Sequence, residues 1–212
     1  MTKVSDRLNK LSESATLAMA RMSQELKAEG KDIIALSLGE PDFDTPEFVK
    51  EAAKKAIDNN FSHYTPVAGL LELRKSICKK FKRDNGLHFT PEQIIVSTGA
   101  KQSITNVCFS LLNNGDEVLL PAPYWVSYSE IVKLAEGIPI FIPSSIDKDF
   151  KVSSEDIEKH ITDKTKILMF SSPCNPSGTV FTQKELQDIA KMLEKYPNIY
   201  IVSDEIYEHI NF

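Results

Sequence analysis

The chain has 212 residues, of which 42% are hydrophobic and 26% are charged, and its formal net charge is −5. This composition is ordinary for a soluble globular protein and supplies enough apolar side chains for a core. The scattered basic residues give no electrostatic footprint for nucleic acid. Apolar runs such as 166–170 are far shorter than the roughly 20 residues of a membrane span. Because charged residues stand where an export signal needs an apolar block, we expect a cytoplasmic protein.

The cysteines Cys78, Cys108 and Cys174 lie far apart and lack the spacing of metal ligands. We therefore expect neither a metal site nor a disulfide framework. Cys78 and Cys108 are predicted to be reduced thiols in the core.

Helices and strands are predicted to alternate along the chain. Thr45 is a predicted helix N-cap with Pro46 in the first helical position, and the amphipathic run continues to about Ile57. The elements predicted after it are a helix over 69–83, a short buried strand over 94–97, a helix over 101–112, a strand over 117–120, a helix over 128–136, a strand over 138–142, a helix opened by the capping box of Ser153 and Asp156, a strand over 166–170, a helix opened by the capping box of Thr182 and Glu185, and a strand over 199–202.

The predicted strands are apolar without polar alternation, and helices separate them. This pattern predicts an α/β fold, with a mostly parallel sheet covered by helices on both faces. Ligands of such sheets bind at the carboxyl ends of the strands, so we look there for functional residues.

Two common nucleotide-binding motifs are missing from the sequence. None of the eight glycines is separated from another by a single residue, so the Gly-x-Gly-x-x-Gly fingerprint is absent, as is a Walker A loop. A nicotinamide enzyme or a nucleoside triphosphatase of the usual kind is therefore disfavoured.

Several segments that follow predicted strands carry polar, aromatic or small residues. Segment 98–102 opens a helix whose N–H groups and dipole favour an anion, although a simple tight turn is equally compatible with it. Asn175 lies in a rigid turn between two prolines, Asp204 ends a buried strand, and Tyr207 follows three residues later. Taken alone, Asp204 could be a helix cap and Trp125 a core residue.

The order of these segments resembles fold-type-I pyridoxal-phosphate aminotransferases, and in particular the bacterial aspartate aminotransferase subgroup. The resemblance runs from about Ser14 to the end of the chain and rests on six motifs in order: Gly39-Glu-Pro-Asp-Phe, Tyr64-Thr-Pro-Val-Ala-Gly69, Thr98-Gly-Ala-Lys-Gln102, Pro123-Tyr-Trp125, Asn175-Pro-Ser-Gly178 and Ser203-Asp-Glu-Ile-Tyr207.

The resemblance implies a binding site for pyridoxal 5′-phosphate. Gly99, Ala100 and Lys101 match the segment that binds the cofactor phosphate. Trp125 matches the aromatic ring that stacks on the pyridine. Asp204 matches the carboxylate that faces the pyridine nitrogen, where a negative charge favours the protonated form.

The remaining matches concern the ring oxygen, the partner subunit and the substrate. Asn175 and Tyr207 match donors to the oxygen on the cofactor ring. Tyr64 matches a tyrosine that reaches the phosphate of the neighbouring subunit, which implies a homodimer. Gly39 and Asn175, with Trp125, match residues that contact the substrate.

Three residues bear on which substrate is used. In the subgroup that acts on acidic amino acids, Thr16 and Lys101 would lie near the distal carboxylate of the substrate, where a lysine suits a point charge. Ser12 stands where members that also use prephenate often have lysine, so prephenate activity is less expected than aspartate activity.

The resemblance also implies that Phe212 precedes the lysine that carries the cofactor and the arginines that hold its phosphate and the substrate carboxylate. We expect residues 1–45 to form an N-terminal arm and the start of a small domain, and residues 46–212 to form part of the large cofactor-binding domain. The chain alone should be inactive. Its sheet should be incomplete at the C-terminal side, with an exposed edge that favours aggregation.

Three hypotheses for function follow. The complete protein could be an aminotransferase for aspartate or another donor, with amino acids and 2-oxo acids as substrates. The same fold could serve another pyridoxal-phosphate reaction, such as a lyase or decarboxylase. The chain could also be a non-catalytic product that binds an intact subunit.

Overall fold

The computed structural model describes residues 4–36 and 38–210. The chain divides into two compact units, one formed by residues up to 15 together with those from 98 onward, and the other by residues 16–97. The boundary predicted between residues 45 and 46 concerns the domains of the complete protein and stays a prediction.

The first unit contains a sheet of four parallel strands in the order β2-β1-β3-β4. Its strands are β1 (Glu117–Pro121), β2 (Ile138–Ile142), β3 (Thr165–Ser171) and β4 (Tyr200–Asp204). The next strand in the chain, β2, lies on one side of β1, and the strand after it, β3, lies on the other side. The ends of β1 and β3 therefore meet at a topological switch point, where such sheets bind ligands.

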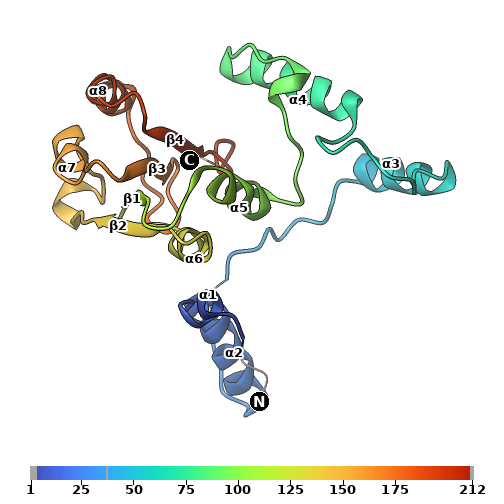
Figure 1. Ribbon diagram of the computed structural model, residues 1–212. Coiled ribbons are helices and arrows are strands. Elements are labelled where there is room, and N and C mark those ends of the chain that lie inside the picture. Colours follow the sequence, from blue (N-terminus) through green and yellow to red (C-terminus); the bar gives the residue numbers. More distant parts are fainter. Residues whose placement is uncertain (1–3, 37, 211–212) are drawn as a thin grey trace. The chain divides into compact units, whose positions relative to one another are not determined.

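Helices cover both faces of this sheet (Figure 1), which confirms the predicted α/β fold. The helices α5 (Ala100–Leu111) and α6 (Ser127–Leu134) lie on one face, and α7 (Ser154–Glu158) and α8 (Gln183–Leu193) lie on the other. Alternate residues of β1 enter different cores: Val118 packs on the side of α5 and α6, and Leu119 on the side of α7 and α8.

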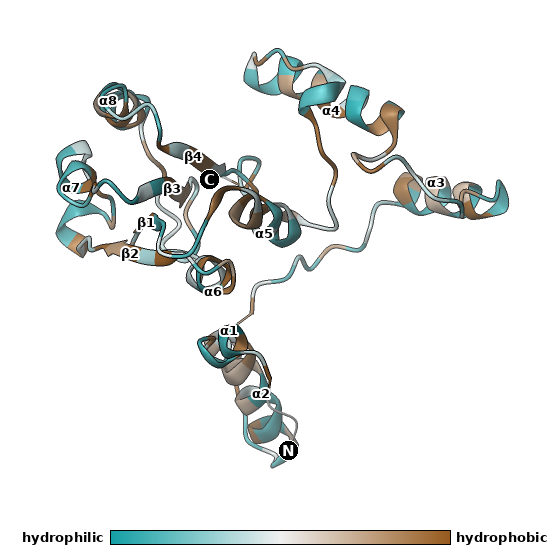
Figure 2. Cartoon of the chain, in the orientation of Figure 1, coloured by the Kyte–Doolittle hydropathy of each residue, from teal (hydrophilic) through white to brown (hydrophobic). Residues whose placement is uncertain are grey.

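Burial on both faces explains why the strands lack polar alternation. The middle of β3 is accordingly hydrophobic in Figure 2. Ile167, Leu168 and Met169 are fully buried there, and each such side chain contributes roughly 1.5–3 kcal/mol through its removal from water. The strand β4 lies next to β3 at one edge of the sheet, and its Tyr200 and Ile201 are about half exposed.

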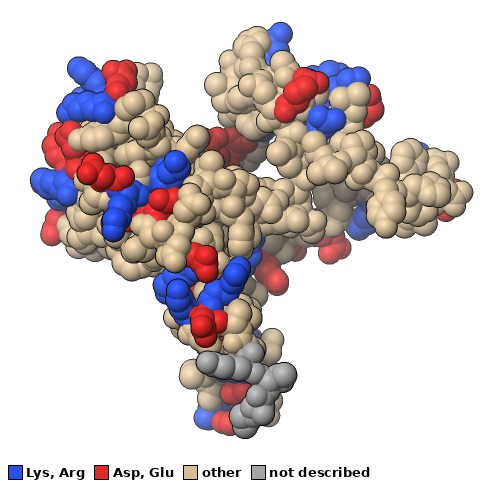
Figure 3. Space-filling model, in the orientation of Figure 1, with Lys and Arg blue, Asp and Glu red and all other residues tan. Residues whose placement is uncertain are grey.

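The two predicted capping boxes are confirmed. The Ser153 hydroxyl accepts a hydrogen bond from Asp156 N, and the Thr182 hydroxyl accepts one from Glu185 N. In both boxes the acidic side chain binds back to the N-cap N–H. Around α7 and α8 acidic and basic side chains are intermixed on the visible face (Figure 3).

The second unit contains most of α2 (Ala15–Ala28), and also α3 (Glu47–Asp58), the helix α4 (Leu71–Asn85) and the 3₁₀ turn η1 (Pro91–Gln93). Arg74 of α4 donates from Nε to Gly69 O (3.2 Å) and from Nη1 to Pro91 O (2.8 Å). This guanidinium thus joins the turn before α4 to the segment after it. Several large apolar side chains of this unit, including Phe48 and Ile57, are exposed.

The strand predicted over 94–97 is wrong, because these residues form no strand in the structure. Ile94 is buried, as the apolar pattern suggested, and Val96 N donates to Ala68 O (3.0 Å). Apolar character alone does not make a strand, since a strand also needs a neighbour that continues the ladder of backbone hydrogen bonds.

Smaller differences occur at helix ends. The helix α3 begins at Glu47 with Pro46 as its N-cap, one residue later than predicted from Thr45. The short helix α1 (Asp6–Asn9), the helix α2 and the 3₁₀ turn η2 (Ile146–Lys148) were not predicted. The helix α1 lies against α6, where Ser12 N donates to the Glu130 carboxylate at 2.8 Å.

The three cysteines are free. Cys108 is fully buried in the core beneath α5, and this burial raises the pKa of its thiol to about 11. Cys78 is only half-buried, so its prediction as a core thiol is wrong. Within residues 4–36 and 38–210, no helix is long and apolar enough to cross a membrane.

Candidate functional site

A cavity of about 160 Å³ opens at the carboxyl ends of β3 and β4. Five of the residues that line it were singled out from the sequence: Ala100, Trp125, Asn175, Asp204 and Tyr207. Three others were not: Tyr128, Ser171 and Ile206. Residues at or after the ends of β1, β3 and β4 thus contribute to one cavity, as expected for the carboxyl edge of a parallel sheet, and the N-terminus of α5 adds Ala100.

The N-terminus of α5 forms one wall of the cavity through Ala100. Gly99 precedes it as the N-cap with φ 85°, a conformation that residues with a β-carbon rarely adopt. The Gly99 carbonyl accepts from the N–H groups of Gln102 and Ser103, and the Gln102 side chain binds back to Thr98 N. The first N–H groups of a helix lack partners within the helix, so this terminus favours an anion.

Trp125 supplies a flat apolar surface. The indole packs edge-to-face against the Tyr128 ring, with ring centroids 5.5 Å apart and an interplanar angle of 90°. The Lys101 ammonium lies 5.0 Å from the centroid of the Trp125 ring, within the range of a cation–π contact. Lys101 therefore lies beside the cavity without lining it.

Asp204 ends β4 and accepts a hydrogen bond at each carboxylate oxygen. Tyr128 Oη donates to Oδ2 at 2.7 Å, and Ile206 N donates to Oδ1 at 3.2 Å. Both bonds stabilise the negative charge and fix the plane of the carboxylate. Burial raises the pKa of the Tyr128 hydroxyl, and the bond to Asp204 raises it further, so the phenol stays a donor.

Asn175 and Tyr207 also lie together. Asn175 Nδ2 donates to Tyr207 Oη at 3.2 Å, which places an amide and a phenol side by side in the cavity wall. Asn175 N lies 3.4 Å from Ser171 Oγ at the end of β3. The turn that carries Asn175 is closed by Gly178 N to Cys174 O (2.7 Å) and Cys174 N to Thr179 O (2.9 Å).

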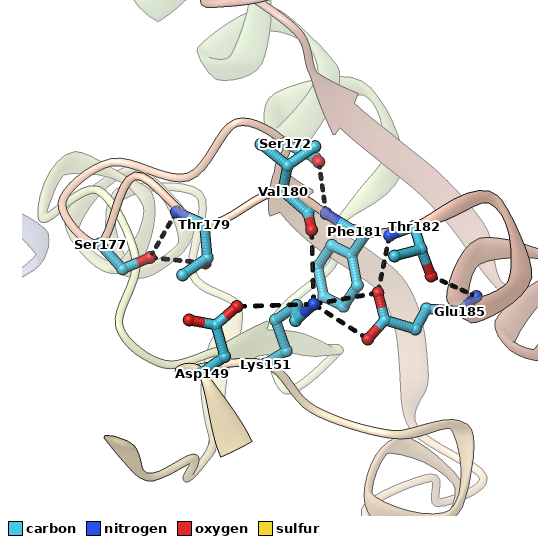
Figure 4. A network of polar contacts seen from close by, with 9 residues as sticks. All are labelled: Asp149, Lys151, Ser172, Ser177, Thr179, Val180, Phe181, Thr182 and Glu185. Carbon is cyan, nitrogen blue, oxygen red and sulfur yellow. Dashed lines mark hydrogen bonds and ion pairs between the residues drawn. The ribbon is translucent and has the colours of Figure 1, made fainter. Parts of the chain in front are cut away.

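A network of polar contacts holds the outer limb of this turn (Figure 4). Lys151 Nζ lies 3.0 Å from the Glu185 carboxylate and 3.5 Å from the Val180 carbonyl. Phe181 N donates to Ser172 Oγ at 3.1 Å, so both ends of the turn are tied to each other. Since only 17% of the Lys151 side chain is exposed, its charge is screened less than that of a surface lysine.

Replacing Lys151 with methionine, which keeps the apolar stem and removes the charge, is expected to lower the free energy of unfolding by about 1–2 kcal/mol. Urea unfolding of the complete protein measures the change. Lys184→Met is the matched control, because Lys184 pairs with Asp188 on the same helix while its side chain is 81% exposed. Equal losses for the two variants would contradict a structural role for the Lys151 network.

The structure brings some predicted residues together and leaves others in the second unit. Ala100, Trp125, Asn175, Asp204 and Tyr207 share the cavity, with Gly99 and Lys101 next to it. Three further predicted residues, Thr16, Gly39 and Tyr64, belong to the other unit, so their place at the site stays a prediction.

Sequence reasoning missed Tyr128 and Ser171. Ser171 is the last residue of a buried strand, and the criterion that selected Asp204 would have found it. Tyr128 lies three residues after Trp125, in the first turn of α6, and the role of its hydroxyl depends on a tertiary contact in which the side chain reaches the last residue of β4.

The residues present fit a planar, anionic cofactor with a basic ring nitrogen. A helix N-terminus favours a phosphate, an indole stacks on a flat ring, and a carboxylate with two donors favours a protonated ring nitrogen. The amide and phenol of Asn175 and Tyr207 can donate to an oxygen on the same ring.

Comparison with known proteins agrees with this geometry. The family model for aminotransferase class I and II matches residues 31–212. A probable aspartate/prephenate aminotransferase of Rickettsia felis is 50% identical over 212 residues, which are 100% of this chain and 52% of that protein.

Two solved structures are also similar. The aspartate aminotransferase from Rhizobium meliloti has a TM-score of 0.96 and 39% identity, and the alignment covers 100% of this chain and 53% of that one. The aspartate aminotransferase from Thermus thermophilus with maleate has a TM-score of 0.94 and 42% identity, with 99% and 55% covered.

The chain spans about half the length of the relatives it matches. Members of the matched family use pyridoxal 5′-phosphate. The family match covers most of the sequence, including every residue that lines the cavity. The chain belongs to the class I and II aminotransferase family.

Proposed function

We propose that the complete protein transfers the amino group of aspartate to 2-oxoglutarate and uses pyridoxal 5′-phosphate as cofactor. The observation that carries the proposal is the cavity in which Asp204, Trp125 and Asn175 meet. The names of the relatives support the choice of aspartate, since the Rickettsia felis protein is a probable aspartate/prephenate aminotransferase and the two structures are aspartate aminotransferases.

In this proposal each wall of the cavity contacts one part of the cofactor. The N–H groups of Gly99, Ala100 and Lys101 hold the phosphate, and Trp125 stacks on the ring. Asp204 keeps the ring nitrogen protonated, and Asn175 and Tyr207 donate to the ring oxygen. When bound, the cofactor supplies an electron sink for the charge that develops at the substrate α-carbon.

The substrate residues are also part of the proposal. Gly39 and Asn175 contact the α-carboxylate of the substrate, Trp125 borders it, and Thr16 and Lys101 lie near the distal carboxylate. The ammonium of Lys101 is already close to Trp125, which places a positive charge beside the proposed ring site. A flexible ammonium suits an acidic substrate as a point charge.

The assembly and location of the complete protein are proposed as well. Tyr64 reaches the cofactor phosphate of a second copy, so the protein is a homodimer, and it works in the cytoplasm. Tyr64 is fully exposed in its own unit, which leaves its hydroxyl accessible to a partner subunit.

A coupled assay tests this function. The complete protein is incubated with cofactor, aspartate and 2-oxoglutarate, and oxaloacetate is measured. We expect turnover with aspartate, and none from residues 1–212 alone, because the resemblance implies that the lysine that carries the cofactor is not among them. Turnover with aromatic or branched donors but not with aspartate would overturn the acidic-substrate proposal, and a parallel arm with prephenate as amino acceptor tests the role of Ser12.

A further inference from the structure

Tyr128 contacts both of the groups that would define the position of the cofactor ring. Its ring packs at 90° against Trp125, and its hydroxyl donates to Asp204 Oδ2 at 2.7 Å. The side chain is fully buried, and its backbone N–H donates to Trp125 O at 2.9 Å. The phenol therefore lies between an aromatic surface that follows β1 and a carboxylate that ends β4.

We propose that Tyr128 is a positioning residue that fixes the Asp204 carboxylate relative to Trp125 and thereby sets how strongly the protein binds and protonates the cofactor ring. This inference rests on the proposed function of the cavity. It adds to that function a residue that would act through Asp204 and Trp125.

The surroundings of Tyr128 leave its hydroxyl little freedom. The ring lies in the core between α6 and the sheet, together with Ile131 and Met169. Burial and the carboxylate both raise the pKa of the hydroxyl, whereas hydrogen bonding with the nearby Ser171 hydroxyl lowers it. The phenol thus remains protonated at neutral pH and presents a fixed donor to Asp204.

The bond matters because a carboxylate can rotate. The backbone N–H of Ile206 donates to Asp204 Oδ1 and restrains that oxygen. With this single hydrogen bond, the carboxylate plane could still rotate. The second bond, from Tyr128 to Oδ2, removes this freedom. A donor also stabilises the negative charge, so its removal favours transfer of a shared proton from the ring nitrogen to Asp204.

The test is Tyr128→Phe in the complete protein, which removes one oxygen atom and keeps the buried ring. Equilibrium dialysis of the apoprotein measures the dissociation constant for pyridoxal 5′-phosphate. We expect it to rise roughly ten- to hundredfold, the loss typical of a hydrogen bond to a charged group. With ¹⁵N-labelled cofactor, the ring-nitrogen resonance should move from its protonated toward its unprotonated position.

Tyr196→Phe is the matched control. Tyr196 Oη also donates to a carboxylate, that of Glu158 at 3.1 Å, but it packs with the core on the opposite face of the sheet. This variant should leave both the dissociation constant and the nitrogen resonance unchanged. Thermal melts of both apoproteins separate a loss of stability from a loss of positioning.

A double-mutant cycle completes the test. If the hydroxyl acts through Asp204, Tyr128→Phe should cause little further loss of cofactor affinity in an Asp204→Ala background, where the hydroxyl has lost its acceptor. An unchanged dissociation constant and nitrogen resonance in Tyr128→Phe, with only a lower melting temperature, would show a purely structural residue and overturn the inference. If the wild-type apoprotein binds no cofactor, the proposed function fails, and this inference fails with it.

Discussion

Asp204→Asn is expected to lower kcat of the complete protein with aspartate on the order of a thousandfold. Asparagine has nearly the same shape and keeps one acceptor oxygen for Tyr128, but it carries no negative charge. In the proposed complex the bound ring would cover this half-buried carboxylate, and removing one partner of a covered, hydrogen-bonded charge pair costs about 2–5 kcal/mol. Each 1.36 kcal/mol of lost transition-state stabilisation lowers the rate about tenfold. Steady-state kinetics with saturating cofactor measure the change.

Asp188→Asn provides the comparison for this variant. Asp188 lies on α8, its side chain is about half exposed, and it pairs with Lys184. Removing that charge should leave kcat within about twofold of the wild type, since exposed ion pairs contribute little. If Asp204→Asn retained more than a tenth of the wild-type kcat, the carboxylate would not be the group that keeps the ring nitrogen protonated.

Much of the first unit could be predicted because its signals are local. The capping boxes at Ser153 and Thr182 each involve side chains three residues apart, so a short stretch of sequence contains the whole interaction. Buried strands of a parallel sheet also leave a plain apolar signature. Asp204 could be singled out as a functional residue because it ends an apolar strand and because parallel strands end at one edge, although this strand, β4, is a half-exposed edge strand and not the buried strand that was predicted.

Other features depend on contacts that a short stretch of sequence does not contain. Residues 94–97 have the composition of a buried strand, yet the backbone bond that the structure gives Val96 goes to Ala68, in the turn before α4. Tyr128 could be assigned to a helix, but its bond to Asp204 spans 76 residues. Both outcomes are set by tertiary packing, which overrides local propensity.

The close approach of Gly69 to Val96 explains why one position of the family resemblance, Gly69, is a glycine. Gly69 closes the segment that begins at Tyr64, and its φ is +95°. A β-carbon built on it would lie 2.8 Å from Val96 Cβ and 2.9 Å from Val96 Cγ2. The position therefore excludes a side chain twice, through its backbone conformation and through its close approach to Val96.

Gly69→Ala is accordingly expected to destabilise the unit formed by residues 16–97 by roughly 3 kcal/mol, the sum of a strained φ and an overpacked contact. Relief of the contact requires Val96 to move away and breaks its hydrogen bond to Ala68. Hydrogen exchange of peptides covering residues 90–97 measures this directly, and the Val96 amide should lose protection by about a hundredfold or more, at tenfold per 1.4 kcal/mol.

Gly86→Ala separates the two causes. Gly86 follows α4 in the same unit with φ 67°, but a β-carbon there would meet no atom within 4 Å. Its substitution should therefore cost only the conformational strain, about 1 kcal/mol. Equal losses of hydrogen-exchange protection at residues 90–97 in Gly69→Ala and Gly86→Ala would contradict this explanation. The requirement for glycine at position 69 would then come from its backbone conformation alone. Because Gly69 packs against Val96, we expect a larger loss of amide protection in Gly69→Ala than in Gly86→Ala, concentrated at residues 94–97.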